Sequence, residues 1–326
     1  MDILITGGAG FIGSHLAERL LKDGHSVIAV DDLSTGQMSN LDVALQNPNF
    51  EFIKGSILDM DLMQELIDRT ELTFHLAAAV GVKLIMEQPS QSILTNISGT
   101  ENVLKAALKD KKTVFVASTS EVYGKASKMP FHEDDDLVIG ATVNLRWSYA
   151  CTKTLDEFLA LSYAYEQQLP VVVLRFFNTT GPRQTGRYGM VVPNFIDSAL
   201  ADRPIMVHGS GDQSRCFSHV KDVIEGLIRL MNTEASRGQV VNIGSDQEIS
   251  IMELAKGVKS LTGSSSEIKV IPYTDVYPHG FEDMQRRMPD VSRLQGLTGF
   301  VPETVLDDII NDIIKEKRSL GEPKVA

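Results

Sequence analysis

Cysteine is nearly absent from the chain, which has only Cys151 and Cys216 among its 326 residues. Two cysteines are too few for a disulfide framework, and a structural or incidental role is expected for Cys151, which lies in the expected helix after residue 147. Long apolar runs are missing too, since none approaches the roughly 18 residues that a membrane span requires. The first residues lead into a strand pattern and not into a signal peptide. We therefore expect a cytoplasmic protein without a membrane partner.

Positive charge is also in short supply. The chain has 31 Lys and Arg against 43 Asp and Glu, a formal net charge of -12. This balance disfavours nucleic acid as a partner, although a local basic pocket could still hold an anionic substrate. The hydrophobic share of 43% and the charged share of 23% are ordinary for a globular protein with a sizeable core. We find no internal repeat and predict no metal site.

The first motif is a glycine-rich turn between an expected strand at 2–6 and an expected helix that continues to Gly24. Gly7, Gly10 and Gly13 form a G-x-x-G-x-x-G pattern. The first glycines let the backbone turn tightly and approach a pyrophosphate, and the third lets the helix pack closely on the strand. Exposed N–H groups at the start of the helix complement phosphates. The turn therefore predicts a dinucleotide site.

An acidic strand end strengthens this interpretation. The next apolar run, 26–30, is followed by Asp31 and Asp32, about 20 residues after the turn. A carboxylate there accepts hydrogen bonds from ribose hydroxyls and would repel a 2′-phosphate, so NAD is preferred over NADP. A glycine turn that served packing alone would leave the acidic strand end unexplained.

Strand and helix patterns alternate through the first half of the chain, which predicts an α/β fold with a doubly wound parallel sheet. Beyond residue 176 the pattern loosens. We predict one domain at 1–175 and a smaller α/β domain at 176–326, with interleaved boundaries and some C-terminal segments returning to the first domain. The further expected strands are 50–53, 72–78, 113–117, 171–176, 205–207, 240–243 and 268–271. The further expected helices are 62–67, 90–107, 191–201, 220–231, 251–261 and 305–315.

A candidate acid–base pair begins the helix that follows residue 147. Tyr149 and Lys153 are four residues apart and project from one helix face. A free phenol, with a pKa near 10, is a poor base at neutral pH, but a nearby cation stabilises the phenolate and lowers its pKa. The alternative is that the two are merely neighbours on a helix surface.

Taken together, these motifs resemble the extended short-chain dehydrogenase/reductase family of nucleotide-sugar epimerases, dehydratases and decarboxylases. The resemblance covers roughly residues 1–314 and implies a Rossmann-type NAD-binding domain, a C-terminal nucleotide-sugar domain and an active site between them. It rests on Gly7, Gly10, Gly13, Asp31, His75, Leu76, Ala77, Ala78, Asn96, Ser118, Thr119, Tyr149, Lys153, Asn178, Arg215 and Asp222.

The resemblance also implies catalytic roles. Tyr149 would remove the proton of the sugar 4-hydroxyl while hydride passes from C4 to NAD, with Lys153 as its pKa modulator and Thr119 supporting the oxygen. Ser120 and Glu121 follow that Thr, as in UDP-glucuronate decarboxylases, where such residues are associated with decarboxylation and C5 reprotonation. Dehydratases of the family usually have Asp-Glu after the Thr, and simple 4-epimerases generally lack the Glu.

A second discriminator is Arg287, in a segment that resembles the one whose Arg faces the substrate carboxylate in the decarboxylases. A guanidinium is a planar, bidentate partner for a carboxylate. A β-keto acid then loses CO₂ readily, because the 4-ketone accepts the electrons. The alternative reading of Arg287 is an interdomain or solvated ion pair.

The remaining expected contacts also follow from the resemblance. One departure is Gly55-Ser56-Ile57, since the family commonly has Asp where Ser56 stands. The expected NAD contacts are Gly7, Gly10, Phe11, Ile12, Gly13, Asp31, Asp32, Ser56, Ile57, Leu76, Ala77, Ala78, Asn96, Tyr149 and Lys153. The expected substrate contacts are Asn178, Val192, Phe195, His208, Arg215 and Arg287.

The sequence thus predicts an NAD-retaining UDP-glucuronate decarboxylase. A UDP-sugar 4-epimerase acting on UDP-glucose, UDP-glucuronate or UDP-N-acetylglucosamine is the alternative, and a 4,6-dehydratase is third. A catalytically silent NAD-sensing protein is disfavoured, since Thr119, Tyr149 and Lys153 are all present. The resemblance further implies a homodimer built through a four-helix bundle of the helices that carry Asn96 and Tyr149.

Overall fold

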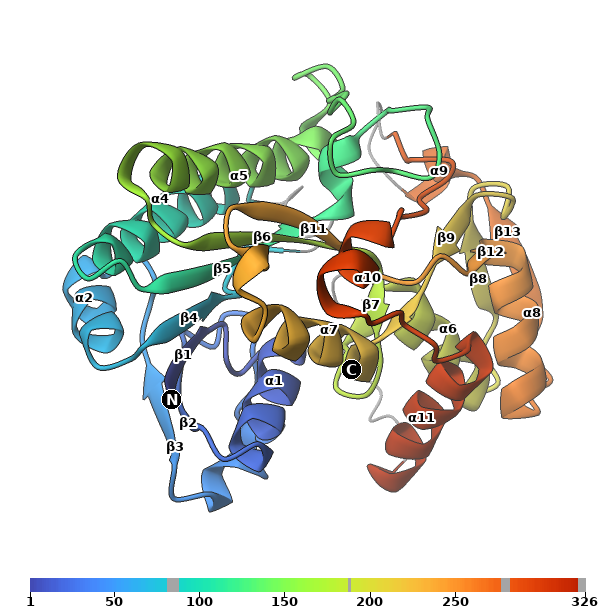
Figure 1. The fold of residues 1–326 in the computed structure, drawn as a ribbon. Coiled ribbons are helices and arrows are strands. Elements are labelled where there is room, and N and C mark those ends of the chain that lie inside the picture. Colours follow the sequence, from blue (N-terminus) through green and yellow to red (C-terminus); the bar gives the residue numbers. More distant parts are fainter. Residues whose placement is uncertain (81–87, 187–188, 277–281, 322–326) are drawn as a thin grey trace.

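A seven-stranded, wholly parallel sheet organises the computed structural model, which describes residues 1–80, 88–186, 189–276 and 282–321 (Figure 1). The strand order is β11-β6-β5-β4-β1-β2-β3, so the chain reverses its direction of travel across the sheet after β3. The predicted doubly wound α/β fold is confirmed. The strands are β1 (Asp2–Thr6), β2 (Ser26–Asp31), β3 (Phe50–Lys54), β4 (Leu72–His75), β5 (Thr113–Thr119), β6 (Val171–Phe176) and β11 (Gln239–Ile243).

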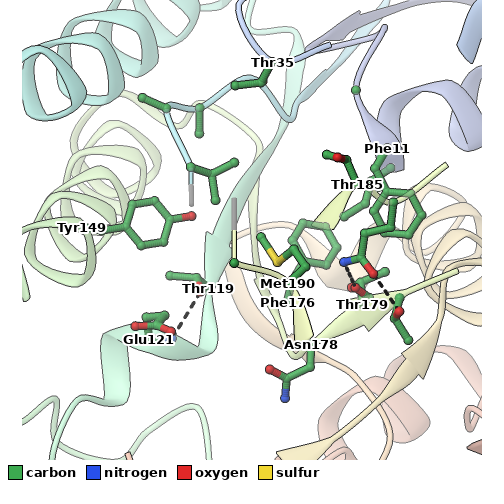
Figure 2. A pocket seen from close by; sticks show the side chains of 18 of the residues that line it. Phe11, Thr35, Thr119, Glu121, Tyr149, Phe176, Asn178, Thr179, Thr185 and Met190 are labelled. Atoms are coloured by element: carbon green, nitrogen blue, oxygen red, sulfur yellow. Dashed lines mark hydrogen bonds between the residues drawn. The ribbon is translucent and has the colours of Figure 1, made fainter. Parts of the chain in front are cut away.

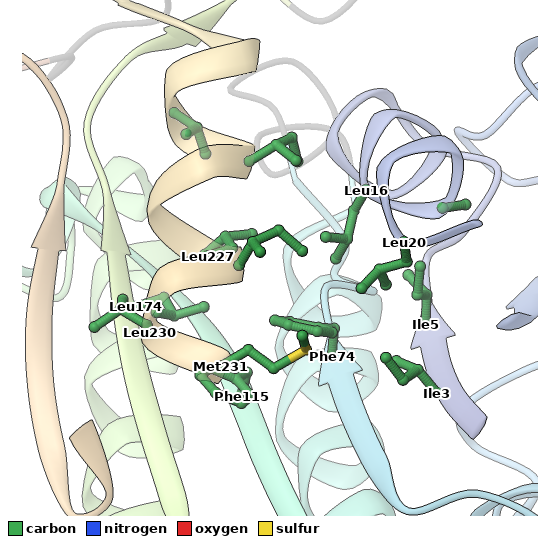
Figure 3. Close-up of a cluster of buried hydrophobic side chains, with 14 of the residues drawn as sticks. Ile3, Ile5, Leu16, Leu20, Phe74, Phe115, Leu174, Leu227, Leu230 and Met231 are labelled. Carbon is green, nitrogen blue, oxygen red and sulfur yellow. The ribbon is translucent and has the colours of Figure 1, made fainter. Parts of the chain in front are cut away.

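Helices cover both faces of this sheet, because successive strand side chains point to opposite sides. Ile3 and Ile5 of β1 pack into one cluster with α1 and α7, whereas Leu4 packs into the other with α2, α4 and α5. Figure 3 shows the first cluster, where side chains of α1 and α7 meet Phe74 and Phe115. The helices are α1 (Phe11–Lys22), α2 (Met60–Asp68), α4 (Pro89–Leu108), α5 (Ser148–Gln167) and α7 (Val220–Met231).

A second group of elements lies beside the carboxyl ends of the strands and has its own apolar cluster, formed by α6, α8, α11 and the strands β8 and β13 (Figure 1). Its helices are α6 (Val191–Leu200), α8 (Ile251–Thr262) and α11 (Leu306–Ser319), with the shorter α9 (Tyr273–Val276) nearby. The short α10 (Ser292–Thr298) instead packs on α7 and β11. Its paired strands are β7 (Thr179–Thr180) with β10 (Ser218–His219), β8 (Ile205–His208) with β13 (Ile268–Ile271), and β9 (Ser214–Cys216) with β12 (Glu248–Ser250).

Two elements refine the sequence-based expectations. The strand expected at 72–78 ends at His75, because its neighbour β1 ends at Thr6, where the glycine turn begins, and leaves no ladder beyond that pair. The strand expected at 240–243 forms as β11 and pairs with β6 as an edge of the large sheet. Of the helices in the described ranges, none combines the length and the apolarity needed to cross a bilayer.

The glycines of α1 and α8 give a matched test of this packing. A Cβ on Gly13 would lie 2.3 Å from the carbonyl oxygen of Gly7, whereas one on Gly257 would meet nothing within 4 Å. We expect Gly13→Ala to lower the free energy of unfolding by at least about 1 kcal/mol through overpacking. Gly257→Ala should raise it by about 0.5 to 1 kcal/mol, because alanine favours the helix. Urea unfolding of both variants measures the difference, and equal effects would contradict the close packing.

Candidate active site

A cavity of about 1100 Å³ opens at the carboxyl ends of the strands, between the sheet and the second group of elements. Open parallel sheets bind their ligands at this edge, where the strand order reverses. Nearly all the predicted site residues line it. They are Gly7, Gly10, Phe11, Ile12, Gly13, Asp31, Asp32, Ile57, Leu76, Ala77, Ala78, Thr119, Ser120, Glu121, Tyr149, Lys153, Asn178, Val192, Phe195, His208, Arg215 and Arg287.

The glycine turn fits a diphosphate. Gly7 has φ +71, and a Cβ on it would lie 2.8 Å from the backbone nitrogen of Ala77. A side chain at this position would therefore clash with the segment that follows β4. Helix α1 begins after Gly10 without a side-chain cap, and its first-turn residues Phe11 and Ile12 line the cavity. Uncapped N–H groups and the positive end of the helix dipole suit an anion.

Asp31 closes β2 at the far side of this turn. Its carboxylate accepts hydrogen bonds from the backbone N–H groups of Ala9 at 3.0 Å and Leu33 at 2.8 Å. Burial raises the pKa of Asp31, while these N–H groups oppose the rise. The carboxylate is therefore fixed to the glycine turn, and Asp32 beside it also lines the cavity. Hydrogen bonds from the adenosine ribose of NAD to these two carboxylates stay a prediction.

Two of the predicted NAD contacts do not line the cavity. The Ser56 hydroxyl accepts a hydrogen bond from the N–H of Leu58 at 3.2 Å. Asn96 is buried in α4, where its side chain accepts from the N–H of Ala79 at 2.7 Å and donates to the carbonyl of the same residue at 3.3 Å. Asn96 thus holds the segment that follows β4, and contact of either side chain with NAD stays a prediction.

The three residues predicted for the oxidation step converge on one side of the cavity. Figure 2 shows the Tyr149 ring, on α5, directing its hydroxyl into the cavity, with Thr119 and Glu121 beside it at the end of β5. The Thr119 hydroxyl accepts from the N–H of Glu121 at 3.2 Å, which leaves its own O–H to donate to a ligand. Lys153 lies one helical turn beyond Tyr149.

The electrostatics around Tyr149 differ from the simple expectation of a phenol activated by a lysine. Lys153 is buried and its Nζ lies 2.7 Å from Oδ2 of Asp156, so a carboxylate offsets its charge. Burial, followed by the negative charges of Glu121 and Asp156, raises the pKa of Tyr149 above its ordinary value. These surroundings therefore favour the neutral form of Tyr149.

Glu121 lies between two arginines. It belongs to the short 3-10 helix η3 (Ser120–Tyr123) and forms ion pairs with Arg146 and, at 3.0 Å, with Arg287. Burial would raise the pKa of Glu121, but Arg146 and then Arg287 outweigh it and lower the pKa to about 2. Arg287 also donates to the Ser120 hydroxyl at 3.4 Å. The predicted Ser120, Glu121 and Arg287 are thus brought together, with Arg146 as a fourth member.

A third arginine lies close by. Nη2 of Arg215 lies 2.8 Å from Oδ2 of Asp283. This oxygen also accepts a hydrogen bond from the Tyr273 hydroxyl at 3.2 Å. Burial, and then the neighbouring Arg287, lower the pKa of Arg215. Arg146, Arg215 and Arg287 carry three positive charges against the two carboxylates of Glu121 and Asp283. This part of the cavity is therefore basic in an acidic chain, which suits an anionic substrate.

The remaining predicted substrate contacts lie on the other wall. Asn178, which has φ +33, donates from its side chain to the carbonyl of Cys216 at 2.9 Å. Val192 and Phe195 belong to α6 and combine packing in its apolar cluster with a place in the cavity lining. Burial lowers the pKa of His208, at the end of β8. Their contacts with substrate stay predictions.

Sequence reasoning missed three residues of this site as functional candidates: Arg146, Asp156 and Asp283. Arg146 lies three residues before Tyr149, but this position does not reveal its ion pair with Glu121. The available signal was local for Asp156, three residues after Lys153 on the same helix. No local signal points to Asp283, since its partner Arg215 is distant in the chain.

The fold, the glycine turn with its acidic strand end, and the pairing of Tyr149 with Lys153 define a dinucleotide-dependent enzyme of the short-chain dehydrogenase/reductase type. The chain belongs to the NAD dependent epimerase/dehydratase family, whose model matches residues 3–244. It is an NAD-dependent enzyme that modifies nucleotide sugars.

The chain is similar over nearly its whole length to several named proteins. A UDP-N-acetyl-alpha-D-glucosaminuronate decarboxylase of Bacillus cytotoxicus is 48% identical, over 97% of this chain and 98% of that protein. UDP-glucuronic acid decarboxylase 1 of Xenopus tropicalis is 37% identical, over 96% of this chain and 71% of that protein. The solved UDP-glucuronic acid 4-epimerase of Bacillus cereus is 28% identical with a TM-score of 0.89, over 98% of this chain and 100% of that one.

The arginine clamp on Glu121 predicts a stability effect. Arg146→Met leaves a buried carboxylate with one partner fewer, and we expect the free energy of unfolding at pH 7 to fall by about 3 kcal/mol. Adding Glu121→Gln to that variant should recover much of the loss. Because the pKa of Glu121 is lowered, its contribution is present above pH 4.5 and is lost as the pH falls toward 2. Urea unfolding of the parent protein, of each single variant and of the double variant tests this, and strictly additive losses would contradict the clamp.

Proposed function

We propose that the protein decarboxylates a UDP-linked hexuronate, by oxidation at C4, loss of CO₂ and return of the hydride. The observation that carries the proposal is the pair of guanidinium groups of Arg146 and Arg287 on Glu121, in the same cavity as Tyr149. A guanidinium can form bidentate hydrogen bonds with a carboxylate. A uronate substrate requires such a group close to Tyr149, whereas a neutral hexose does not.

The protein's own groups account for the proton transfer that accompanies oxidation at C4. In the fraction of molecules in which it is ionised, Tyr149 accepts the proton of the sugar 4-hydroxyl, and the Thr119 hydroxyl donates to the oxygen that develops there. The glycine turn would hold the diphosphate of NAD, and Asp31 its ribose. When bound, NAD supplies the acceptor and later the donor of the C4 hydride. Hydride and proton are both returned, so the cofactor is not consumed.

The decarboxylation step uses the arginine cluster. Arg287 would exchange its hydrogen bond to Glu121 for one to the substrate carboxylate, while Arg146 keeps Glu121 in place. As the bond between C5 and the carboxylate breaks, CO₂ leaves and its electron pair moves toward the 4-ketone. With only one arginine left on it, Glu121 would regain a higher pKa, take up a proton from solvent and deliver that proton to C5, supported by Ser120.

The relatives narrow the substrate to two candidates. The 48% identical relative is named for UDP-N-acetylglucosaminuronate, and the 37% identical one for UDP-glucuronic acid. The two uronates differ at C2 and share the C4 hydroxyl and the carboxylate that the proposed chemistry needs. We place UDP-N-acetylglucosaminuronate first and UDP-glucuronate second. The epimerase alternative rests on the 28% identical solved structure.

Mass spectrometry of the nucleotide product tests the proposal directly. The protein is incubated with NAD and, separately, with UDP-N-acetylglucosaminuronate and UDP-glucuronate. We expect a product lighter by one CO₂ from at least one of them, and the ratio of the two kcat/KM values identifies the preferred uronate. A product of unchanged mass with inverted C4 would establish the epimerase instead.

Arg287 and its neighbour provide a matched pair of variants. We expect Arg287→Met to lower kcat/KM for CO₂ release about 100-fold, equivalent to roughly 2.7 kcal/mol of lost transition-state binding. Arg286→Met should leave it unchanged, because Arg286 is half-exposed and paired with Glu248 at 2.7 Å on the surface. Equal losses of kcat/KM in both variants would contradict a contact between Arg287 and the substrate carboxylate.

We also propose that the protein is a homodimer joined through α4 and α5. These helices lie side by side over one face of the sheet (Figure 1). Their outer sides expose Leu94 by 59%, Leu155 by 47% and Phe158 by 64%. A neighbouring group of exposed apolar side chains is typical of a protein interface, and a second copy of the same helices would complete a four-helix bundle.

Sedimentation measures the association state. We expect the protein to have the mass of a dimer and Leu155→Glu/Phe158→Glu to have that of a monomer, because two carboxylates would be buried in the interface. Val305→Glu, at an equally exposed apolar residue elsewhere, should remain dimeric. A monomeric parent protein would overturn the proposal.

The division of the chain into an NAD-binding part at 1–175 and a substrate-binding part at 176–326, with C-terminal segments returning to the first, is part of the same proposal. So is a cytoplasmic location, which is supported by the two free cysteines.

A further inference from the structure

A buried ion pair lies directly behind the proposed base. Nζ of Lys153 is 2.7 Å from Oδ2 of Asp156, and their side chains are only 2% and 1% exposed. Lys153 lines the cavity but Asp156 does not, so the carboxylate acts from inside the protein. Charges buried this deeply interact far more strongly than charges at a surface.

A chain of hydrogen-bonded neutral side chains lies beside this pair. The Thr100 side chain, on α4, faces Asp156 and lies 3.1 Å from Nε2 of His75. Nδ1 of His75 lies 2.8 Å from the Thr6 hydroxyl, which accepts from the N–H of Ala77 at the cavity wall. Burial, and then Lys153, lower the pKa of His75 to about 3, so its ring is neutral. These side chains are uncharged, so they add no charge that would compensate Asp156.

The charged groups around the pair come from several elements. Tyr149 experiences Glu121 from η3 and Asp156 from its own helix. Asp156 itself faces Lys153 and Glu157 on α5, and burial raises its pKa. Glu157 forms an ion pair with Arg175 of β6 at 2.7 Å. Glu121 forms ion pairs with Arg146 and Arg287. Asp156 is thus the carboxylate paired with Lys153.

We propose that Asp156 is a positioning residue that holds the Lys153 ammonium in place behind Tyr149 and reduces the charge that this ammonium exerts on the phenol. The inference rests on the proposed role of Tyr149 as the base. The consequence concerns the step in which the O4–H bond breaks and its proton moves to the phenolate oxygen. Asp156 sets the pH range in which that phenolate exists.

The competing explanation is that Asp156 serves only as the counter-charge that makes burial of Lys153 tolerable. Both explanations require a carboxylate, and they differ in what Asp156→Asn does. The amide keeps the shape and a hydrogen-bond acceptor but removes the negative charge. With that charge gone, the ionised phenol is favoured, so ionisation of Tyr149 should move to lower pH. A purely structural role predicts lower stability without that shift.

The first experiment is a titration of the Tyr149 phenol by the ultraviolet absorbance of phenolate, in protein saturated with NAD and without a sugar. Subtracting the Tyr149→Phe titration in each background isolates this residue. We expect the midpoint in Asp156→Asn to lie about one pH unit below that of the parent protein. Asp156→Glu, which keeps the charge, should titrate near the parent. An unchanged or raised midpoint in Asp156→Asn would overturn the proposal.

The second experiment is the pH–rate profile of NADH formation with whichever UDP-sugar is oxidised. We expect the rising limb of kcat to shift to lower pH by the same amount in Asp156→Asn, with KM little changed. A loss of rate equal at every pH would contradict the proposal. Should Asp156→Asn not fold, Asp156→Ser, which leaves room for a water beside Lys153, allows the same two measurements.

The two experiments separate this inference from the proposed function. The titration uses NAD alone, so a protein that decarboxylates neither uronate can still show or lack the shift. The rate profile needs only oxidation at C4, which epimerases and decarboxylases share. Absence of CO₂ release therefore counts against the function, and an unshifted titration counts against the role of Asp156.

Discussion

Parallel pairing of the seven strands is the constraint on which the rest of the molecule depends. It brings the carboxyl ends of β1, β2, β5 and β6 to one edge of the sheet. The residues that follow those strands therefore lie close together at that edge. The glycine turn follows β1, Asp31 closes β2, and Thr119 closes β5. A site assembled from strand ends is held by the sheet, so its geometry does not depend on any single loop.

Much of this could be read from the sequence, because the informative residues act within a few positions of one another. The glycine turn, the acidic strand end and the Tyr149–Lys153 spacing are each local patterns whose physical meaning survives without a structure. The limits appear where partners are distant. Arg146 and Arg287 meet at Glu121 only after β5, α5 and the C-terminal segments have packed. The early end of β4 depends on where its neighbour β1 stops, which strand propensity does not encode.

Burial is the other quantity that the sequence conceals. A lysine four residues after a tyrosine suggests an activated phenol, but the sign of the effect depends on what surrounds the lysine. Here Asp156 and the desolvated site act against the charge of Lys153, and the pKa of Tyr149 rises. The same applies to the whole chain: a net charge of -12 coexists with a cluster of guanidinium groups in the cavity. Overall charge governs solubility, whereas local charge governs the ligand.

The return of the chain to the large sheet has a consequence for how such a molecule can change over time. After forming α6 and β8 beside the cavity, the chain runs back through α7 and supplies β11 to the edge of the sheet, before leaving again for α8. The segments on the two sides of the cavity are therefore interwoven and cannot be inherited or exchanged as separate modules. In such an architecture, new substrate preferences arise most readily by replacing single side chains around the cavity. Recombination at one crossover point would separate β11 from the strand β6 with which it pairs.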